Sequence, residues 1–450
     1  MCTIRWENNS TYMLLFETHV LNHTLIDQFF ISRERWVDVK YDLVVRNARL
    51  PDSAEATDLG VLDGRIAEQA DDLGPGETEL DAAGGLVAGG FVDPHVHLDK
   101  ALVADQVPTN ESRTLSEAIE NDRERKRVES AADVSQRAER AIKMHVRHGC
   151  TRIRTHVDID PIGGLTALDG VLAAREACSE IADVQIVVFP QEGIECAPGT
   201  EDLLTEALER DVDGIGGIPA LERTEEAKKR HVDTCLSLGE RHDVAIDLHV
   251  DETDDPTARS AEYLAARTIE EGLEGRVTAG HVCALSAYDE SHAERVIDLL
   301  ATAGISVISN PGTNLMLQGR SDQHPKRRGI TRVDQLRAAG VTVASGQDNI
   351  QDAFYQYNNG NMLETASLIA HAAHLQAPTE RRDVWRMVTE HAASVLNVDH
   401  GMEPGMPAAF NVFPSSVRTV TDAIRRCATP RAVIHDGSVV AETAIETTVG

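Results

Sequence analysis

Short apolar runs alternate with amphipathic segments along most of this 450-residue chain. Between residues 89 and 397, runs rich in valine and isoleucine recur, and the segments between them carry apolar residues at three- and four-residue spacing. This alternation predicts strand–helix units and a parallel sheet. The predicted strands are 91–97, 151–157, 184–189, 214–218, 245–250, 277–281, 305–310 and 341–346, and the helical spacers include 115–138, 224–241, 257–272 and 287–303.

Eight such units predict the α/β class and a (β/α)8 TIM barrel over residues 89–400. The chain ends differ, because short strands there flank Asp-Gly pairs at residues 63–64 and 436–437. Asp-Gly favours two-residue hairpin turns, whose central residues need positive φ. We therefore expect a small β-sandwich formed by residues 41–88 and 401–450. Residues 1–40 are interpreted as an extension that the fold does not need; an arm that packs on a neighbour is the alternative.

The charge of the chain limits its partners. With 74 acidic and 43 basic residues, its formal net charge is −31, which disfavours nucleic acids and anionic membranes as partners. Such an acidic chain with only seven lysines suggests a halophilic protein from a salt-rich cytoplasm, where salt screens the repulsion between its charges. The seven cysteines form no CxxC pair, and no apolar run is long enough to span a membrane, so we expect a cytoplasmic protein. We also expect a homo-oligomer.

One dense charge run, residues 121–127, lies inside a predicted helix. Runs of charge on a helix usually face solvent. We interpret this one as a solvated face rather than a binding patch.

Histidine and acidic side chains stand where several predicted strands end. His95 and His97 lie two residues apart, so in a strand both project from one face. His249, His281 and Asp348 end later strands, and the carboxyl ends of barrel strands meet at one mouth. Three imidazoles and a carboxylate, with one histidine to spare, suit Zn²⁺ or Fe²⁺ with a bound water. The pattern predicts a metal-dependent hydrolase.

The order HxH, His, His, Asp resembles that of the amidohydrolase superfamily. The segments between narrow the resemblance to cytosine deaminase-like enzymes: FPQEGI at 189–194, HVDE at 249–252, LQGR at 317–320 and PKRRGITR at 325–332. It extends from Tyr41 to the C-terminus, and the last two segments are its most specific part. It implies one divalent metal ion per chain, Zn²⁺ or Fe²⁺, bound by His95, His97, His249 and Asp348.

The same resemblance implies the roles of the other site residues. Glu252 would be the proton shuttle of a hydrolytic deaminase whose nucleophile is a metal-bound hydroxide steered by Asp348. His281 would hold and polarise that hydroxide, although a fourth metal ligand and a core histidine are alternatives for it. Gln191 would pair with the polar edge of a nitrogen heterocycle. A two-metal site is disfavoured, because no later predicted strand contains the lysine that commonly bridges two metals in the superfamily.

Two departures from the resemblance concern the substrate. Asn349 stands where cytosine deaminases typically have a second aspartate, and Phe354 where a tryptophan is usual. The sequence around Lys100 and Asn349 more closely resembles that of the N-alkylammelide hydrolase branch, whose members remove amines from triazine rings. We expect a cytosine-like or aminotriazine-like substrate, with Asn349 and Phe354 in contact with it. The alternatives are ring-opening hydrolysis of a cyclic amide, as in hydantoinases and dihydroorotases, and a non-catalytic scaffold barrel.

Overall fold

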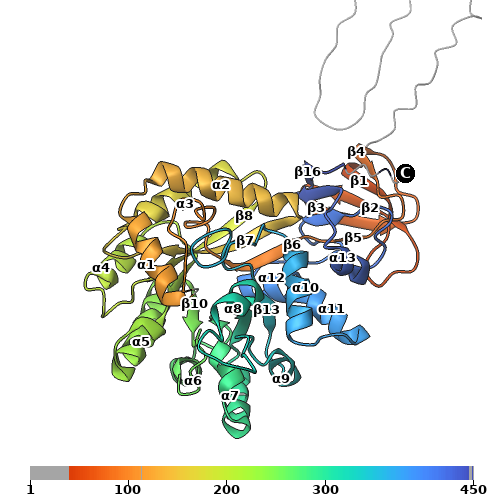
Figure 1. Cartoon of the computed structure of the whole chain (residues 1–450). Helices are drawn as coiled ribbons and strands as arrows, with labels where there is room; N and C mark the ends of the chain where they lie inside the picture. Colours follow the sequence, from red (N-terminus) through yellow and green to blue (C-terminus); the bar gives the residue numbers. More distant parts are fainter. Residues whose placement is uncertain (1–39, 113, 445–447, 449–450) are drawn as a thin grey trace, which may run out of the picture. The chain divides into compact units, whose positions relative to one another are not determined.

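The computed structural model describes residues 40–112, 114–444 and 448. Its largest sheet has eight strands that pair in chain order, each parallel to the next (Figure 1). They are β6 (Phe91–Val96), β7 (Cys150–Asp158), β8 (Asp183–Phe189), β9 (Gly214–Gly217), β10 (Ala245–Val250), β11 (Val277–His281), β12 (Ser306–Ser309) and β13 (Val343–Ser345). All eight predicted barrel strands are confirmed, with small differences at their ends.

The first and last strands of this sheet meet just beyond β13. Val96 and Asp348 form a parallel bridge. The Asp348 N–H donates to the carbonyl oxygen of His95 at 2.7 Å, and the His97 N–H donates to that of Asp348 at 2.8 Å. These bonds close the sheet into a barrel, and they join the backbone of three residues of the predicted metal site.

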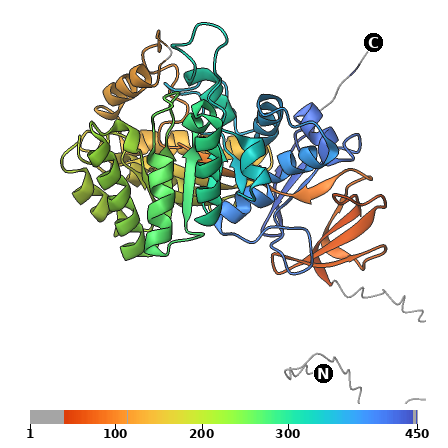
Figure 2. The same ribbon diagram turned by 90° about the horizontal axis from the view of Figure 1, so that it is seen from below.

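Helices surround the barrel (Figures 1 and 2). They are α1 (Leu115–Lys126), α2 (Ala131–Arg147), α3 (Thr166–Ala177), α4 (Thr200–Leu208), α5 (Glu225–His242), α6 (Ser260–Glu271), α7 (Glu290–Thr302), α8 (Pro311–Leu317), α9 (Val333–Ala338), α10 (Met362–Ala372), α11 (Pro378–Arg386) and α12 (Glu390–Leu396), with 3-10 turns η1 (Pro219–Leu221) and η2 (Cys283–Ala287). The spacer predicted at 115–138 is two helices. Ser130 separates them, because its hydroxyl accepts the Asp133 N–H and caps the start of α2.

Segments from both chain ends form two smaller sheets. One has the order β3-β2-β1-β4 and the other β16-β15-β14-β5. Their strands are β1 (Tyr41–Ala48), β2 (Thr57–Leu62), β3 (Arg65–Ala70), β4 (Gly76–Asp81), β5 (Val87–Gly89), β14 (Phe410–Val412), β15 (Ala432–His435) and β16 (Ser438–Glu442); helix α13 (Val420–Arg426) precedes β15. Leu43 and Val45 from one sheet and Phe410 and Ile434 from the other share one buried cluster. The expected sandwich from both ends of the chain is confirmed.

The Asp-Gly pairs are the turns of two hairpins. Asp63 and Gly64 have φ values of 51° and 70° between β2 and β3, and Asp436 and Gly437 have 46° and 77° between β15 and β16. Positive φ at both central positions matches the turn that the sequence predicts.

Only part of the charge run at residues 121–127 faces solvent, because Glu124 and Arg127 are exposed and the residues between them are buried. Lys126 is 4 % exposed, and its Nζ donates to Asp160 at 2.7 Å and to Glu192 at 2.9 Å. Asp122 and Arg125 are buried beside it and bond to each other. The prediction was wrong for the buried residues, because the partners of Lys126 lie at the end of β7 and in the loops after β7 and β8, which the pattern of one helix cannot show.

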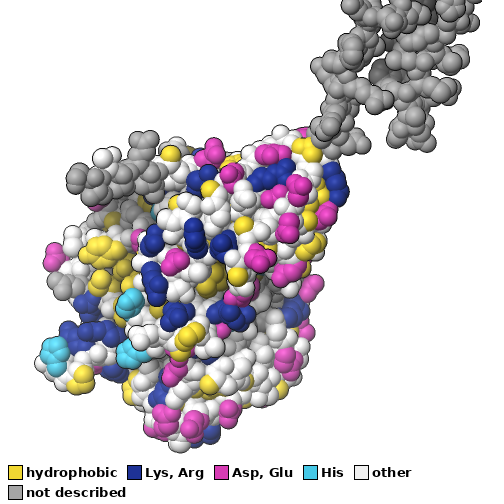
Figure 3. All heavy atoms as spheres, turned by 90° about the vertical axis from the view of Figure 1, so that its right-hand side faces the viewer, with side chains coloured by type: hydrophobic (Ala, Val, Ile, Leu, Met, Phe, Trp, Pro, Cys, Tyr) yellow, Lys and Arg dark blue, Asp and Glu magenta, His cyan; other side chains and the backbone are white. Residues whose placement is uncertain are grey.

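Acidic and basic side chains lie close together on the face that Figure 3 shows. Among the described residues, none of the helices combines the length and apolar character needed to cross a membrane. The predicted extension, residues 1–40, lies outside the described residues apart from Lys40.

Candidate metal centre and active site

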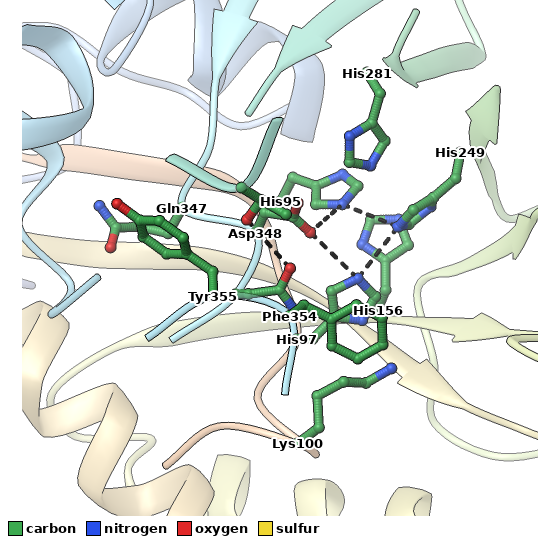
Figure 4. Close-up of polar contacts among 12 residues, drawn as sticks. His95, His97, Lys100, His156, His249, His281, Gln347, Asp348, Phe354 and Tyr355 are labelled. Carbon is green, nitrogen blue, oxygen red and sulfur yellow. Dashed lines mark hydrogen bonds and ion pairs between the residues drawn. The ribbon is translucent and has the colours of Figure 1, made fainter. Parts of the chain in front are cut away.

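The four predicted metal ligands converge at the mouth of the barrel (Figure 4). His95 and His97 come from the end of β6, His249 from β10 and Asp348 from the loop after β13. The Nε2 atom of His249 lies 3.2 Å from Nε2 of His95 and 3.2 Å from Nε2 of His97. Nε2 of His95 and Nε2 of His97 each lie 3.5 Å from Asp348 Oδ1. All four side chains are buried.

These separations fit a metal ion. Metal–nitrogen and metal–oxygen bonds of about 2.0–2.1 Å in a tetrahedron place neighbouring donor atoms about 3.3–3.4 Å apart. Burial and the neighbouring imidazoles hold the pKa of His97 and His249 well below the usual value, and the charge of Lys100 adds to the effect on His97, so both are neutral as ligands must be. Burial opposes ionisation of Asp348, but the nearby imidazoles outweigh it and lower the pKa of that carboxyl. The donor set therefore suits a divalent cation.

His281 lies beside this set, close enough to His95, His249 and Asp348 to belong to a metal cluster with them. Its hydrogen bond to Asn314 argues for another role. The Asn314 amide nitrogen donates to Glu252 Oε1 at 3.2 Å and lies 3.0 Å from Nδ1 of His281. When Nδ1 accepts this N–H, the ring proton is on Nε2, which then has no lone pair for a metal; the Asn314 side-chain oxygen also lies 3.4 Å from Nδ1. Burial lowers the pKa of His281 to about 4, so the ring is neutral.

Glu252 is buried two residues beyond the end of β10. Its Oε1 accepts the Asn314 N–H and lies 3.7 Å from Nδ1 of His281. Burial, with a contribution from Asp348, raises the pKa of Glu252 well above the usual value. A carboxyl whose pKa is raised by its surroundings is suited to take up and release a proton during a reaction.

A small, narrow cavity brings the predicted residues together. Gln191, Asn349 and Phe354, the three residues predicted to contact substrate, all line it. The rest of the lining is His97, His249, Glu252, Asp348, Leu115, Ile218 and Thr313. The site thus combines a metal-ligand set, a buried carboxyl, two amides and an aromatic ring.

The backbone at this mouth is under local strain. His281, Val282 and Asp348 have φ values of 69°, 49° and 62°, in the left-handed region that residues other than glycine rarely adopt. Such residues cluster at functional sites, where the surrounding structure holds them. Gly346 allows the backbone after β13 to lie close to His95, because a Cβ at this position would lie 2.8 Å from the His95 carbonyl oxygen and 2.9 Å from the His95 Cβ.

Several residues of the site were not predicted. Asp93 Oδ1 accepts the N–H groups of His95 and Gln347, which ties β6 to the loop that carries Asp348. Asn314 links Glu252 to His281. Asn314 lies in α8, the helix after β12, and Asp93 lies within β6, where its partner Gln347 comes from the far end of the barrel.

Comparison with known proteins agrees with this geometry. Residues 78–441 match the sequence profile of the "Amidohydrolase family". The chain belongs to the amidohydrolase family.

Three relatives cover most of the chain. The 5-methylcytosine deaminase from Klebsiella pneumoniae, solved with 5-fluorocytosine, is 35 % identical, has a TM-score of 0.86, and the match covers 90 % of this chain and 99 % of that one. The N-isopropylammelide isopropylaminohydrolase from Burkholderia multivorans is 30 % identical, with a TM-score of 0.78 and coverage of 89 % and 98 %. A pterin deaminase from Rhizobium rhizogenes is 33 % identical, over 85 % of this chain and 87 % of its own.

Proposed function

We propose that this amidohydrolase is a hydrolytic deaminase that replaces the exocyclic amine of a planar, nitrogen-rich ring with a water oxygen. The observation that carries the proposal is the position of Glu252. Its buried carboxyl lines the same small cavity as His97, His249 and Asp348, but it is bonded to Asn314 instead of joining the metal-ligand set. Relatives whose names give deamination or amine removal from cyclic substrates support the same class of reaction.

The metal is one divalent ion per chain, Zn²⁺ or Fe²⁺, held by His95, His97, His249 and Asp348. When bound, such an ion lowers the pKa of water to about 7 and so makes hydroxide available. A lysine that could bridge a second metal is absent from the eight barrel strands as the structure bounds them.

The protein residues supply the proton transfers and hold the ring. Glu252 donates a proton to the ring nitrogen beside the reacting carbon, then takes the proton of the attacking oxygen and passes it to the departing amine. The Nε2–H of His281 donates a hydrogen bond to the attacking oxygen as charge develops there. Phe354 covers a face of the ring, while Gln191 and Asn349 contact its polar edge.

The test is a screen of purified enzyme against cytosine, 5-substituted cytosines, isocytosine, creatinine and aminotriazines, with ammonia or amine release as the readout. Hydantoin and dihydroorotate serve as the comparison, because they open to carboxylates without releasing an amine. Amine release from at least one planar ring is expected. Reaction only with the saturated cyclic amides would replace the deaminase by a ring-opening amidohydrolase.

A further inference from the structure

Lys100 is one of the most deeply buried charged residues near the site. It follows β6, its side chain is 1 % exposed, and its Nζ lies 5.4 Å from the centre of the Phe354 ring (Figure 4). Nζ donates to Asp158 Oδ1 at 2.7 Å and to the side-chain oxygen of Gln191 at 3.0 Å. A buried ammonium group is thus bonded directly to an amide that lines the substrate cavity.

This contact fixes the direction of the Gln191 amide. An ammonium group has donors and no acceptor, so the Gln191 atom that faces it must be the oxygen. A flipped amide would set an NH2 group against the ammonium and leave the buried donors of both residues unpaired. Gln191 Nε2 makes no hydrogen bond to another described residue, so its N–H donors remain available at the cavity.

A network of charges holds Lys100 in place. Asp158 binds Lys100 through Oδ1 and Lys126 through Oδ2, at 2.7 and 3.2 Å. Burial alone would favour loss of the Lys100 proton, but Asp158 and Asp99 outweigh it and raise the pKa of this lysine above its usual value. The side chain therefore stays charged and keeps its donors directed at Gln191.

We propose that Lys100 is a positioning residue that determines specificity: by binding the oxygen of Gln191, it makes the cavity offer N–H donors and so selects a ring with an oxo group at that edge. A ring with an amino group at the same position would bring donor against donor. This inference rests on the proposed function and narrows its substrate class to amino rings that also carry an oxo group.

The test uses pairs of rings that differ in one oxo or amino group. Cytosine pairs with 2,4-diaminopyrimidine, and ammeline pairs with melamine. Binding of each compound to the metal-loaded enzyme is measured by calorimetry, and release of ammonia is measured separately. The wild-type enzyme should bind at least one oxo compound, and each oxo compound that binds should do so about 10- to 100-fold more tightly than its partner, as expected for a buried donor left unpaired.

Two variants and a control test whether Lys100, acting through Gln191, causes the preference for oxo compounds. Lys100→Met frees the Gln191 amide to turn, so the preference should shrink to within a few-fold. Gln191→Leu removes the donors and should abolish it. Lys126→Met is the control, because Lys126 also binds Asp158 but does not contact the Gln191 side chain; it should keep the preference. Circular dichroism and metal content establish that each variant is folded.

Equal affinity within both pairs, failure of both oxo compounds to bind, or an unchanged preference in folded Lys100→Met would overturn the role of Lys100. A preference lost equally in Lys126→Met would also overturn it. These outcomes differ from failure of the proposed function, which is an absence of amine release from every planar ring in the wider screen. Selective binding without turnover would support the orientation of Gln191 and count against the deaminase.

Discussion

Replacement of Glu252 by glutamine should remove turnover and leave the fold intact. The side chain is 7 % exposed, and its only hydrogen bond from a described side chain comes from the Asn314 amide, at 3.2 Å. A glutamine oxygen can accept the same bond, so the free energy of unfolding should change by less than about 1 kcal/mol. The amide cannot carry a proton, however. Loss of general acid–base catalysis should lower kcat by about 10²- to 10⁴-fold, or roughly 2.7–5.4 kcal/mol in the barrier.

Asp251→Asn is the matched control, because Asp251 is the preceding residue and is also a buried carboxylate. Its oxygens accept the N–H groups of Ser260 and Ala261 at the start of α6, at 3.0 and 2.8 Å. This variant should lose about 0.5–2 kcal/mol of stability, as helix-capping residues do. It should keep most of its turnover.

The assay measures kcat by amine release, stability by chemical denaturation and bound metal by elemental analysis, for both variants and the wild type. The two variants should show opposite patterns. Glu252→Gln with its metal bound and its turnover within tenfold of wild type would refute the assignment of Glu252 as the shuttle. Loss of metal from this variant would instead place Glu252 among the ligands.

Three further predictions concern the metal, the chain start and the charge. Elemental analysis should find one Zn²⁺ or Fe²⁺ per chain, and His97→Ala should lose the metal and nearly all activity, because its Nε2 is one of four convergent donors; two metals per chain would show that the ligand set is incomplete. Deletion of residues 1–40 should leave a folded, active enzyme, since β1 begins at Tyr41 and pairs with β2 and β4; an insoluble or metal-free product would contradict this. Thermal stability should rise with salt into the molar range, because a net charge of −31 repels itself; a melting temperature indifferent to salt would count against a halophilic protein.

The sequence was most informative where side-chain direction follows from a local period. His95 and His97 share a face because strand residues alternate, and a parallel barrel brings the ends of all its strands to one mouth. That logic placed His249, His281 and Asp348 close together. Asp-Gly turns are equally local and located both hairpins.

Contacts between distant segments could not be predicted in this way. The pattern of α1 alone predicted a solvated face, whereas Lys126 pairs with acids at and just beyond the ends of two different strands. Nδ1 of His281 lies 3.0 Å from the side-chain nitrogen of Asn314, which is 33 residues away in sequence. The direction of the Gln191 amide depends on a lysine 91 residues before it. Each of these features depends on the packed barrel and not on a local repeat.

The most direct test of the central claim is the mass of the product formed in water labelled with heavy oxygen. The substrate is the ring that reacts best in the screen, and the enzyme is the metal-loaded wild type. Hydrolytic deamination predicts an intact ring in which one labelled oxygen has replaced the amine, with one amine released per product. A product that keeps its amine and is heavier by one whole labelled water would mean ring opening and would contradict the deaminase.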